Sequence, residues 1–111
     1  YLRGRSDAVA FVDGLGEAPV LSVLSVAELF AGIREGSERR RLEAMLSACE
    51  LIEVDAAIAR EGGLLRRRYH PSHGVGIVDA TIAATALAHG LRLATRNRKH
   101  FPMLPDLVVP Y

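Results

Sequence analysis

The chain has 111 residues, of which 50% are hydrophobic and 24% are charged, and its formal net charge at pH 7 is +1. This length suffices for one domain with a real core and is too short for two, so we expect a single domain over residues 1–111. The small net charge excludes a general attraction to nucleic acid or membranes, the single cysteine excludes a disulfide or cysteine-based zinc site, and no apolar run is long enough to span a bilayer.

Strand and helix patterns alternate along the chain. Short apolar runs predict strands at residues 20–24, 51–54, 91–94 and 107–109. Helical spacing between capping residues and glycines predicts helices at residues 6–13, 25–36, 37–49, 56–69 and 79–90. This alternation favours an α/β fold with a parallel sheet that is flanked by helices on both faces.

Polar residues define the predicted helix ends. Ser25, Ser37 and Asp55 are suited to cap the helices that follow them, and Pro71 is expected to close the helix that begins after Asp55. Glu28 follows Ser25 by three positions, which is the spacing of a capping box. One interpretation of Glu28 is therefore purely structural.

The stretch around Asp79 predicts a central helix that is buried on most sides. The residues that share a helical face with Asp79 are apolar or small: Ile82, Ala83, Ala86, Leu87 and Gly90. An ionised carboxylate buried without a partner costs several kcal/mol, so helix-start amides, a cation or a metal ion must compensate Asp79. The structural alternative is that the helix dipole favours an aspartate near a helix start, but this explanation is weaker here because the helical spacing turns Asp79 toward the buried face.

Four polar side chains are expected to converge at one edge of the sheet. Glu28, Thr95 and Asn97 follow the ends of predicted strands, and Asp79 opens the helix that leads to one of these strands. Ligands of open α/β sheets bind outside the carboxyl ends of strands. Carboxylate, amide and hydroxyl oxygens there would suit Mg²⁺ or Mn²⁺.

The basic residues divide into two groups. The arginine runs at residues 39–41 and 66–68 are interpreted as solvated helix faces. Arg96, Arg98 and Lys99 surround Asn97 beside the expected metal site, where they could hold backbone phosphates of a nucleic acid.

Three stretches together resemble the PIN-domain ribonucleases, and within them the VapC-type toxins of bacterial toxin–antitoxin pairs. These stretches are residues 22–33 (SVLSVAELFAGI), 73–86 (HGVGIVDATIAATA) and 93–101 (LATRNRKHF). Their order and spacing match across nearly the whole chain. The resemblance implies a PIN-like three-layer fold and a Mg²⁺- or Mn²⁺-dependent endoribonuclease that cleaves RNA phosphodiesters.

The resemblance also assigns roles to individual residues. Glu28 and Asp79 would be two acidic residues of the metal site, and Asn97 would stand near a variable fourth position with support from Thr95. His100 occupies a place where an acid is often found, so the fourth ligand is either Asn97 or His100.

Further expectations follow from the family. Its first strand carries another metal-site Asp and would precede Tyr1; we expect that strand in the natural polypeptide, and the alternative is a truncated, inactive product. The resemblance implies a cytoplasmic homodimer that is neutralised by a VapB-type antitoxin. Two other interpretations are a non-catalytic module that binds RNA or protein, and a different Mg²⁺-binding domain such as a receiver domain.

Overall fold

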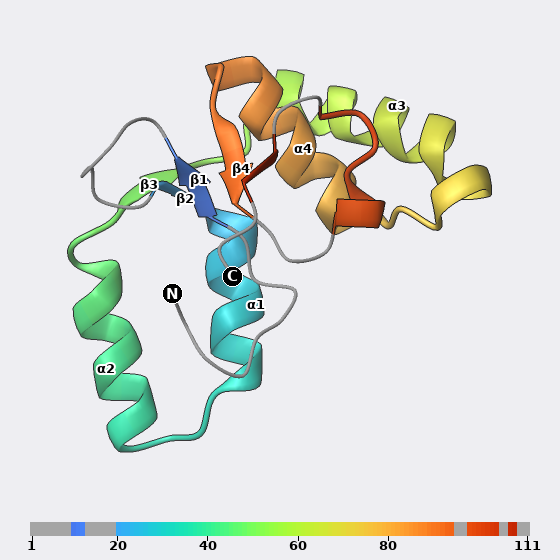
Figure 1. Cartoon of the computed structure of the whole chain (residues 1–111). Helices are drawn as coiled ribbons and strands as arrows, with labels where there is room; N and C mark the ends of the chain where they lie inside the picture. The colour runs from blue at the N-terminus through green and yellow to red at the C-terminus, as the bar shows by residue number, and fades with distance from the viewer. Residues whose placement is uncertain (1–9, 13–19, 95–97, 105–106, 109–111) are drawn as a thin grey trace.

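A computed structural model describes residues 10–12, 20–94, 98–104 and 107–108 (Figure 1). Its elements are β1 (Ala10–Val12), β2 (Val20–Ser22), α1 (Val23–Gly32), α2 (Ser37–Leu46), β3 (Glu50–Ile52), α3 (Ala56–His73), α4 (Ile77–His89), β4 (Arg92–Ala94), the 3₁₀ turn η1 (Arg98–His100) and β5 (Leu107–Val108). Within these ranges, no helix is both long and apolar enough to cross a membrane.

The described strands form one five-stranded sheet in the order β3-β2-β1-β4-β5. β2 pairs in parallel with β3, with Leu21 opposite Leu51, and β4 pairs in parallel with β5, with Leu93 opposite Leu107. β1 lies at the centre of the sheet and runs antiparallel to both of its neighbours. The predicted parallel pairing is therefore confirmed for the two outer pairs and does not extend to β1.

The central strand β1 corrects a prediction for the start of the chain. The sequence predicts a helix over residues 6–13, yet Ala10–Val12 form a strand. Phe11, a residue type that favours strands, is paired with Val20 in β2 and with Leu93 in β4. Without a strand here, backbone groups of β2 and β4 would remain unpaired inside the sheet. Pairing across the sheet therefore outweighs the local capping signal.

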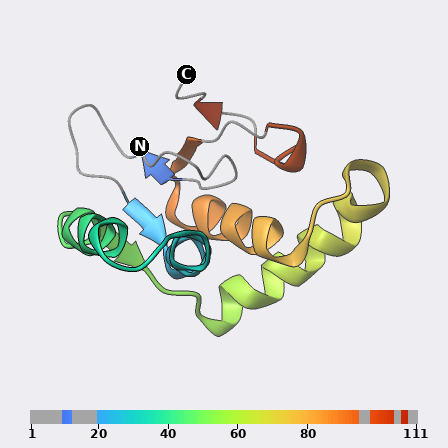
Figure 2. The ribbon, with the colours of Figure 1, turned by 90° about the horizontal axis from the view of Figure 1, so that it is seen from below.

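Helices cover both faces of the sheet. Successive side chains of a strand point to opposite faces. Val20 belongs to a core cluster with Ile82 and Ala83 of α4, whereas Leu21 belongs to a second cluster with Leu29 and Leu42 of α1 and α2. Figure 2 shows the sheet nearly edge-on, with α2 on one side and α3 and α4 on the other. The predicted α/β three-layer fold is confirmed.

Helix α4 is the buried centre of the fold because α3 packs along it (Figure 1). Every residue from 80 to 86 is buried. A Cβ atom at Gly62 of α3 would come within 2.9 Å of the Cα atom of Thr81, so the two helices lie unusually close. The prediction of a buried central helix is confirmed, except that Leu87 is 50% exposed because burial stops one turn before the helix ends.

Two of the helix ends that differ from the predictions involve a glycine or a proline. Gly36, with φ of 92°, is the N-cap of α2, so Ser37 is the first helical residue and not the cap. Helix α3 continues through Pro71, because a proline in the last turn removes only one intrahelical hydrogen bond. The helix ends instead at Gly74, which adopts the left-handed conformation and donates its N–H to the carbonyl of His70 at 2.9 Å.

The predicted cap at Asp55 is confirmed, and it gives a testable expectation for stability. The carboxylate of Asp55 accepts a hydrogen bond from the backbone N–H of Ile58 at 2.8 Å. Replacing Asp55 by alanine should lower the free energy of unfolding by about 1 kcal/mol, whereas Asp55→Asn should change it by only a few tenths, because asparagine caps equally well. Urea denaturation of both variants measures the difference; equal losses would contradict the cap.

Candidate metal site at the start of helix α4

Asp79 lies in the first turn of α4, and its side chain is only 20% exposed. Carboxylates are favoured at this end of a helix by the dipole and by backbone N–H groups that have no partner within the helix. The helix start therefore accounts for part of the compensation that a buried carboxylate requires. A second part comes from outside the helix.

His100 contacts Asp79 directly. Its Nδ1 atom lies 3.1 Å from Oδ2 of Asp79, although 21 residues separate the two in the chain. Figure 1 shows η1, the turn that ends at His100, beside the first turn of α4. From the sequence, His100 could be identified only as an alternative fourth metal ligand, because no spacing rule connects residues so far apart. The contact with Asp79 is therefore a finding of the structure.

Glu28 is half-buried in α1, a helix that begins and ends earlier than predicted. The N-cap of α1 is Ser22, whose Oγ accepts a hydrogen bond from the backbone N–H of Leu24 at 3.1 Å. Ser25 lies inside the helix. The predicted capping box of Ser25 and Glu28 is therefore wrong, and its structural explanation of Glu28 falls away.

The hydroxyl of Ser25 provides a test of whether a polar ligand fits next to Glu28. Ser25 is fully buried, and its Oγ has no hydrogen-bond partner within the part of the chain that the structure describes. Helix residues three positions apart share a face, so this hydroxyl lies on the Glu28 face of α1. An unsatisfied buried hydroxyl costs about 1–3 kcal/mol. The position therefore fits a site that receives a polar group.

The donor chemistry fits a hard divalent cation. Glu28 and Asp79 place carboxylates on α1 and α4, and these two helices contact each other. Carboxylate oxygens are the ligands that Mg²⁺ and Mn²⁺ prefer. Among the described residues, no three His, Cys, Asp or Glu side chains gather as a metal site. The described residues therefore supply part of a donor set, and the direct approach of Glu28 to Asp79 stays a prediction.

The remaining predicted site residues lie partly outside the described ranges. Thr95, Arg96 and Asn97 fall outside them, and for Arg98 only the backbone, within η1, is described. Lys99 is exposed in the same turn. The arginine runs at residues 39–41 and 66–68 are exposed on α2 and α3, as predicted.

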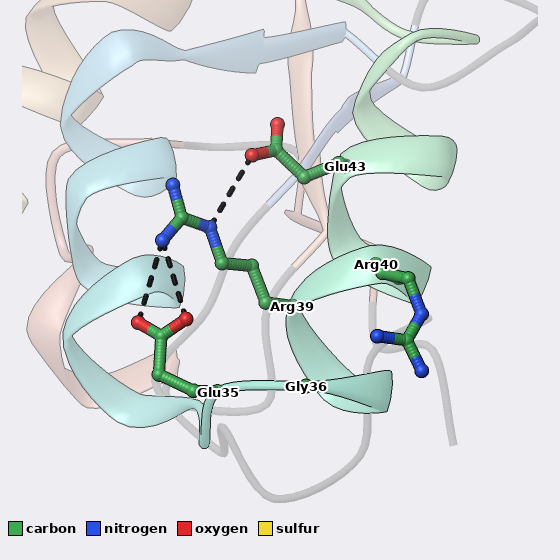
Figure 3. Close-up of a pocket in the computed structure, with 5 residues that line it drawn as sticks. All are labelled: Glu35, Gly36, Arg39, Arg40 and Glu43. Atoms are coloured by element: carbon green, nitrogen blue, oxygen red, sulfur yellow. Dashed lines mark hydrogen bonds and ion pairs between the residues drawn. The ribbon is translucent and has the colours of Figure 1, made fainter.

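A separate pocket of about 350 Å³ lies where α1 is connected to α2 (Figure 3). The guanidinium of Arg39 contacts Glu35 at 3.2 Å and Glu43 at 3.5 Å, and the hydrogen bond to Glu35 is the main cause that raises the pKa of Arg39 above its ordinary value. These side chains are more than half exposed, so the ion pairs contribute little to stability. The cation is already neutralised by two acids, and the pocket offers no group suited to catalysis.

Comparisons with known proteins agree with the fold and with the motifs. The PIN domain family matches residues 1–105. Ribonuclease VapC19 of Mycobacterium tuberculosis is 47% identical over 115 residues, which cover 100% of this chain and 91% of VapC19. A toxin–antitoxin complex from Klebsiella pneumoniae contains a chain with a TM-score of 0.68 and 32% identity, and the match covers 81% of this chain and 72% of that one.

A further structural match is the DNA-bound VapBC of Salmonella typhimurium, with a TM-score of 0.61 and 26% identity over 80% of this chain and 71% of that chain. The family match covers more than half of the chain, and VapC19 exceeds 30% identity over nearly its whole length. The chain therefore belongs to the PIN-domain family, among its VapC-type ribonucleases.

Proposed function

We propose that this protein is the endoribonuclease toxin of a toxin–antitoxin pair and that it cleaves RNA phosphodiesters with Mg²⁺ or Mn²⁺. The observation that carries the proposal is the largely shielded carboxylate of Asp79 at the start of α4, on a helix that contacts the Glu28-bearing helix α1. The relative VapC19 is named a ribonuclease, which favours a catalytic role over a non-catalytic binding module.

The two acids share one task in this mechanism. Glu28 and Asp79 would hold the cation through carboxylate oxygens. Asn97 or His100 would supply a fourth ligand, and Thr95 would support that ligand. A bound divalent ion lowers the pKa of a water and stabilises charge on the leaving oxygen. The N-terminal dipole of α4 favours a negative charge at Asp79, and the low exposure of this side chain restricts its motion.

Positive side chains next to the acids would bind the RNA backbone. Lys99 is exposed in η1, the turn that brings His100 onto Asp79. Arg96 and Arg98 are its neighbours in the sequence. Phosphate contacts from such residues position a strand without reading its bases. We propose that these three cations set the path of the RNA across the acids.

The proposal includes an antitoxin partner. The Klebsiella match is a chain of a toxin–antitoxin complex, and the Salmonella match is a VapBC complex bound to DNA. We therefore propose a VapB-type antitoxin for this protein. A homodimer, a cytoplasmic site of action on RNA, and a single domain over residues 1–111 remain predictions. Co-expression of the antitoxin should relieve the growth arrest that the toxin causes.

A metal-depletion experiment tests the proposed activity. The full-length protein, incubated with single-stranded RNA, should lose cleavage when EDTA is added and regain it when excess Mg²⁺ or Mn²⁺ is restored. Glu28→Gln should remain inactive under every condition, because an amide is a much poorer ligand for these ions than a carboxylate.

The matched control is Glu43→Gln, the same chemical change on the exposed face of α2, where the acid pairs with Arg39. This variant should cleave RNA like the wild type. Cleavage that persists in EDTA and in Glu28→Gln would contradict a metal-dependent nuclease with Glu28 in its site.

A further inference from the structure

The contact between His100 and Asp79 has a defined direction. Oδ2 of Asp79 is a carboxylate oxygen and can only accept, so the Nδ1 atom of His100 at 3.1 Å must carry the hydrogen and donate. A nitrogen that donates a hydrogen bond has no lone pair for a metal ion. Through Nδ1, His100 is therefore a partner of the ligand and not a ligand.

The backbone that carries His100 is tied to the helix that carries Asp79. Phe101 is 1% exposed and belongs to the same core cluster as Ile82 and Ala83 of α4. The carbonyl of Phe101 also accepts a hydrogen bond from the N–H of Leu104 at 3.2 Å, which fixes the turn after His100. The imidazole is therefore held against Asp79 by a backbone segment that is itself fixed to the core.

Both side chains are largely shielded from water. Asp79 is 20% exposed and His100 is 30% exposed. A hydrogen bond in such a position restricts the rotation of a carboxylate more than one on the open surface, because water competes less for the same oxygen. With Oδ2 engaged by His100, the remaining oxygen of Asp79 has a fixed direction.

We propose that His100 is a positioning residue: its Nδ1–H orients the Asp79 carboxylate for binding a divalent cation. This inference rests on the proposed function, because it assumes that Asp79 binds the metal. Hydrogen-bonded partners of metal ligands typically contribute 10–100-fold to metal affinity.

Two isosteric substitutions separate a positioning role from ligation. His100→Asn keeps a donor N–H at the place of Nδ1, because both atoms are bonded to Cγ. His100→Gln instead places its amide where the Nε2 atom of the ring lies. His100→Ala removes both. The readout is the dissociation constant of Mn²⁺, measured by electron paramagnetic resonance of the free ion with the full-length protein, without any RNA or cleavage assay.

We expect His100→Asn to bind Mn²⁺ within about threefold of the wild type, and His100→Gln and His100→Ala to bind about 10–100-fold more weakly. Wild-type affinity in His100→Ala would overturn the inference. Retained affinity in His100→Gln together with loss in His100→Asn would also overturn it, because that is the pattern of a ligand acting through Nε2.

Asp79→Asn, measured in the same way, separates this inference from the proposed function. Unchanged Mn²⁺ affinity in Asp79→Asn would show that the metal assignment itself is wrong. Weak binding in Asp79→Asn with unchanged binding in His100→Ala would overturn only the role of His100.

A measurement on the wild-type chain tests the direction of the hydrogen bond without a metal titration. Long-range proton–nitrogen correlation spectra should show that the ring of His100 carries its hydrogen on Nδ1, and the signal is assigned by its absence in His100→Asn. A ring with hydrogen on Nε2 alone would overturn the proposal, because it could not donate to Asp79.

Discussion

Replacing Asp79 by asparagine is expected to slow RNA cleavage by about two to three powers of ten while the protein stays folded. Metal-stabilised charge in a transition state is worth several kcal/mol, and each 1.36 kcal/mol corresponds to a factor of ten in rate. Asparagine has nearly the same shape, and its Oδ1 can still accept the hydrogen bond of His100. The loss should therefore come from the missing charge and not from unfolding. Cleavage rates of a labelled RNA at saturating Mg²⁺ measure it.

Asp55→Asn is the matched control for Asp79→Asn. Both residues are aspartates at the start of a helix, but Asp55 is the N-cap of α3, and its carboxylate accepts a hydrogen bond from the N–H of Ile58. Asparagine caps as well as aspartate, so stability and cleavage should both stay close to the wild type. Wild-type cleavage by Asp79→Asn would contradict the assignment. So would an equal loss in both variants, because it would point to a general effect of removing a helix-start charge.

The buried helix and the order of the elements after residue 20 could be predicted because their signals are local. A helix with apolar or small residues around most of its circumference must be covered on most sides, and residues 80–86 are buried as expected. The cap at Asp55 and the exposed arginine runs follow from equally local patterns. Asp79 could be identified from the sequence because a charged carboxylate at the start of such an apolar helix is unfavourable unless a partner compensates it.

The start of α1 could not be predicted because two serines offer equally good caps. Ser22 and Ser25 each precede apolar residues, and the following Glu28 favoured Ser25. The structure ends β2 at Ser22 and begins the helix at once. The choice depends on where β2 stops pairing with β3, which is a tertiary contact. An error of three residues here changed the interpretation of Glu28 from a capping residue to a candidate ligand.

Long-range pairing explains the other differences. Residues 10–12 carry a short apolar pattern that fits a helix or a strand, and only their pairing with β2 and β4 decides for the strand. The contact of His100 with Asp79 likewise joins η1 to α4 across 21 residues. The sequence thus identified candidate ligands, whereas their hydrogen-bonded partner required the structure.

The second large effect is expected at Gly62, where α3 and α4 approach most closely among the glycine positions that the structure describes. A Cβ atom there would lie 2.9 Å from the Cα atom of Thr81 and closer still to its Oγ1. The hydroxyl of Thr81 donates a hydrogen bond to the carbonyl of Ile77 at 2.7 Å, so it cannot turn aside without losing that bond. The Cα atom of Thr81 belongs to the backbone and cannot rotate away from an added Cβ atom, so the two helices must separate.

Gly62→Ala should therefore lower the free energy of unfolding by about 1–3 kcal/mol, the usual cost of overpacking, despite the better helix propensity of alanine. For a domain of this size, that corresponds to a fall in Tm of roughly 10 °C. The neighbouring Gly63 is the matched control, because a Cβ atom there meets nothing within 4 Å. Gly63→Ala should raise stability by about 0.5–1 kcal/mol.

Opposite signs for the same substitution at adjacent positions of one helix are a demanding test. Helix propensity alone predicts that alanine stabilises the protein at both positions. A gain in stability for Gly62→Ala would therefore show that α3 and α4 are not in close contact. The contact also bears on activity, since Thr81 lies two residues after Asp79 in α4. A shift of about 1 Å in a catalytic group can cost two powers of ten in rate. Folded Gly62→Ala protein should therefore cleave RNA more slowly than Gly63→Ala protein, because α4 carries both core residues and Asp79.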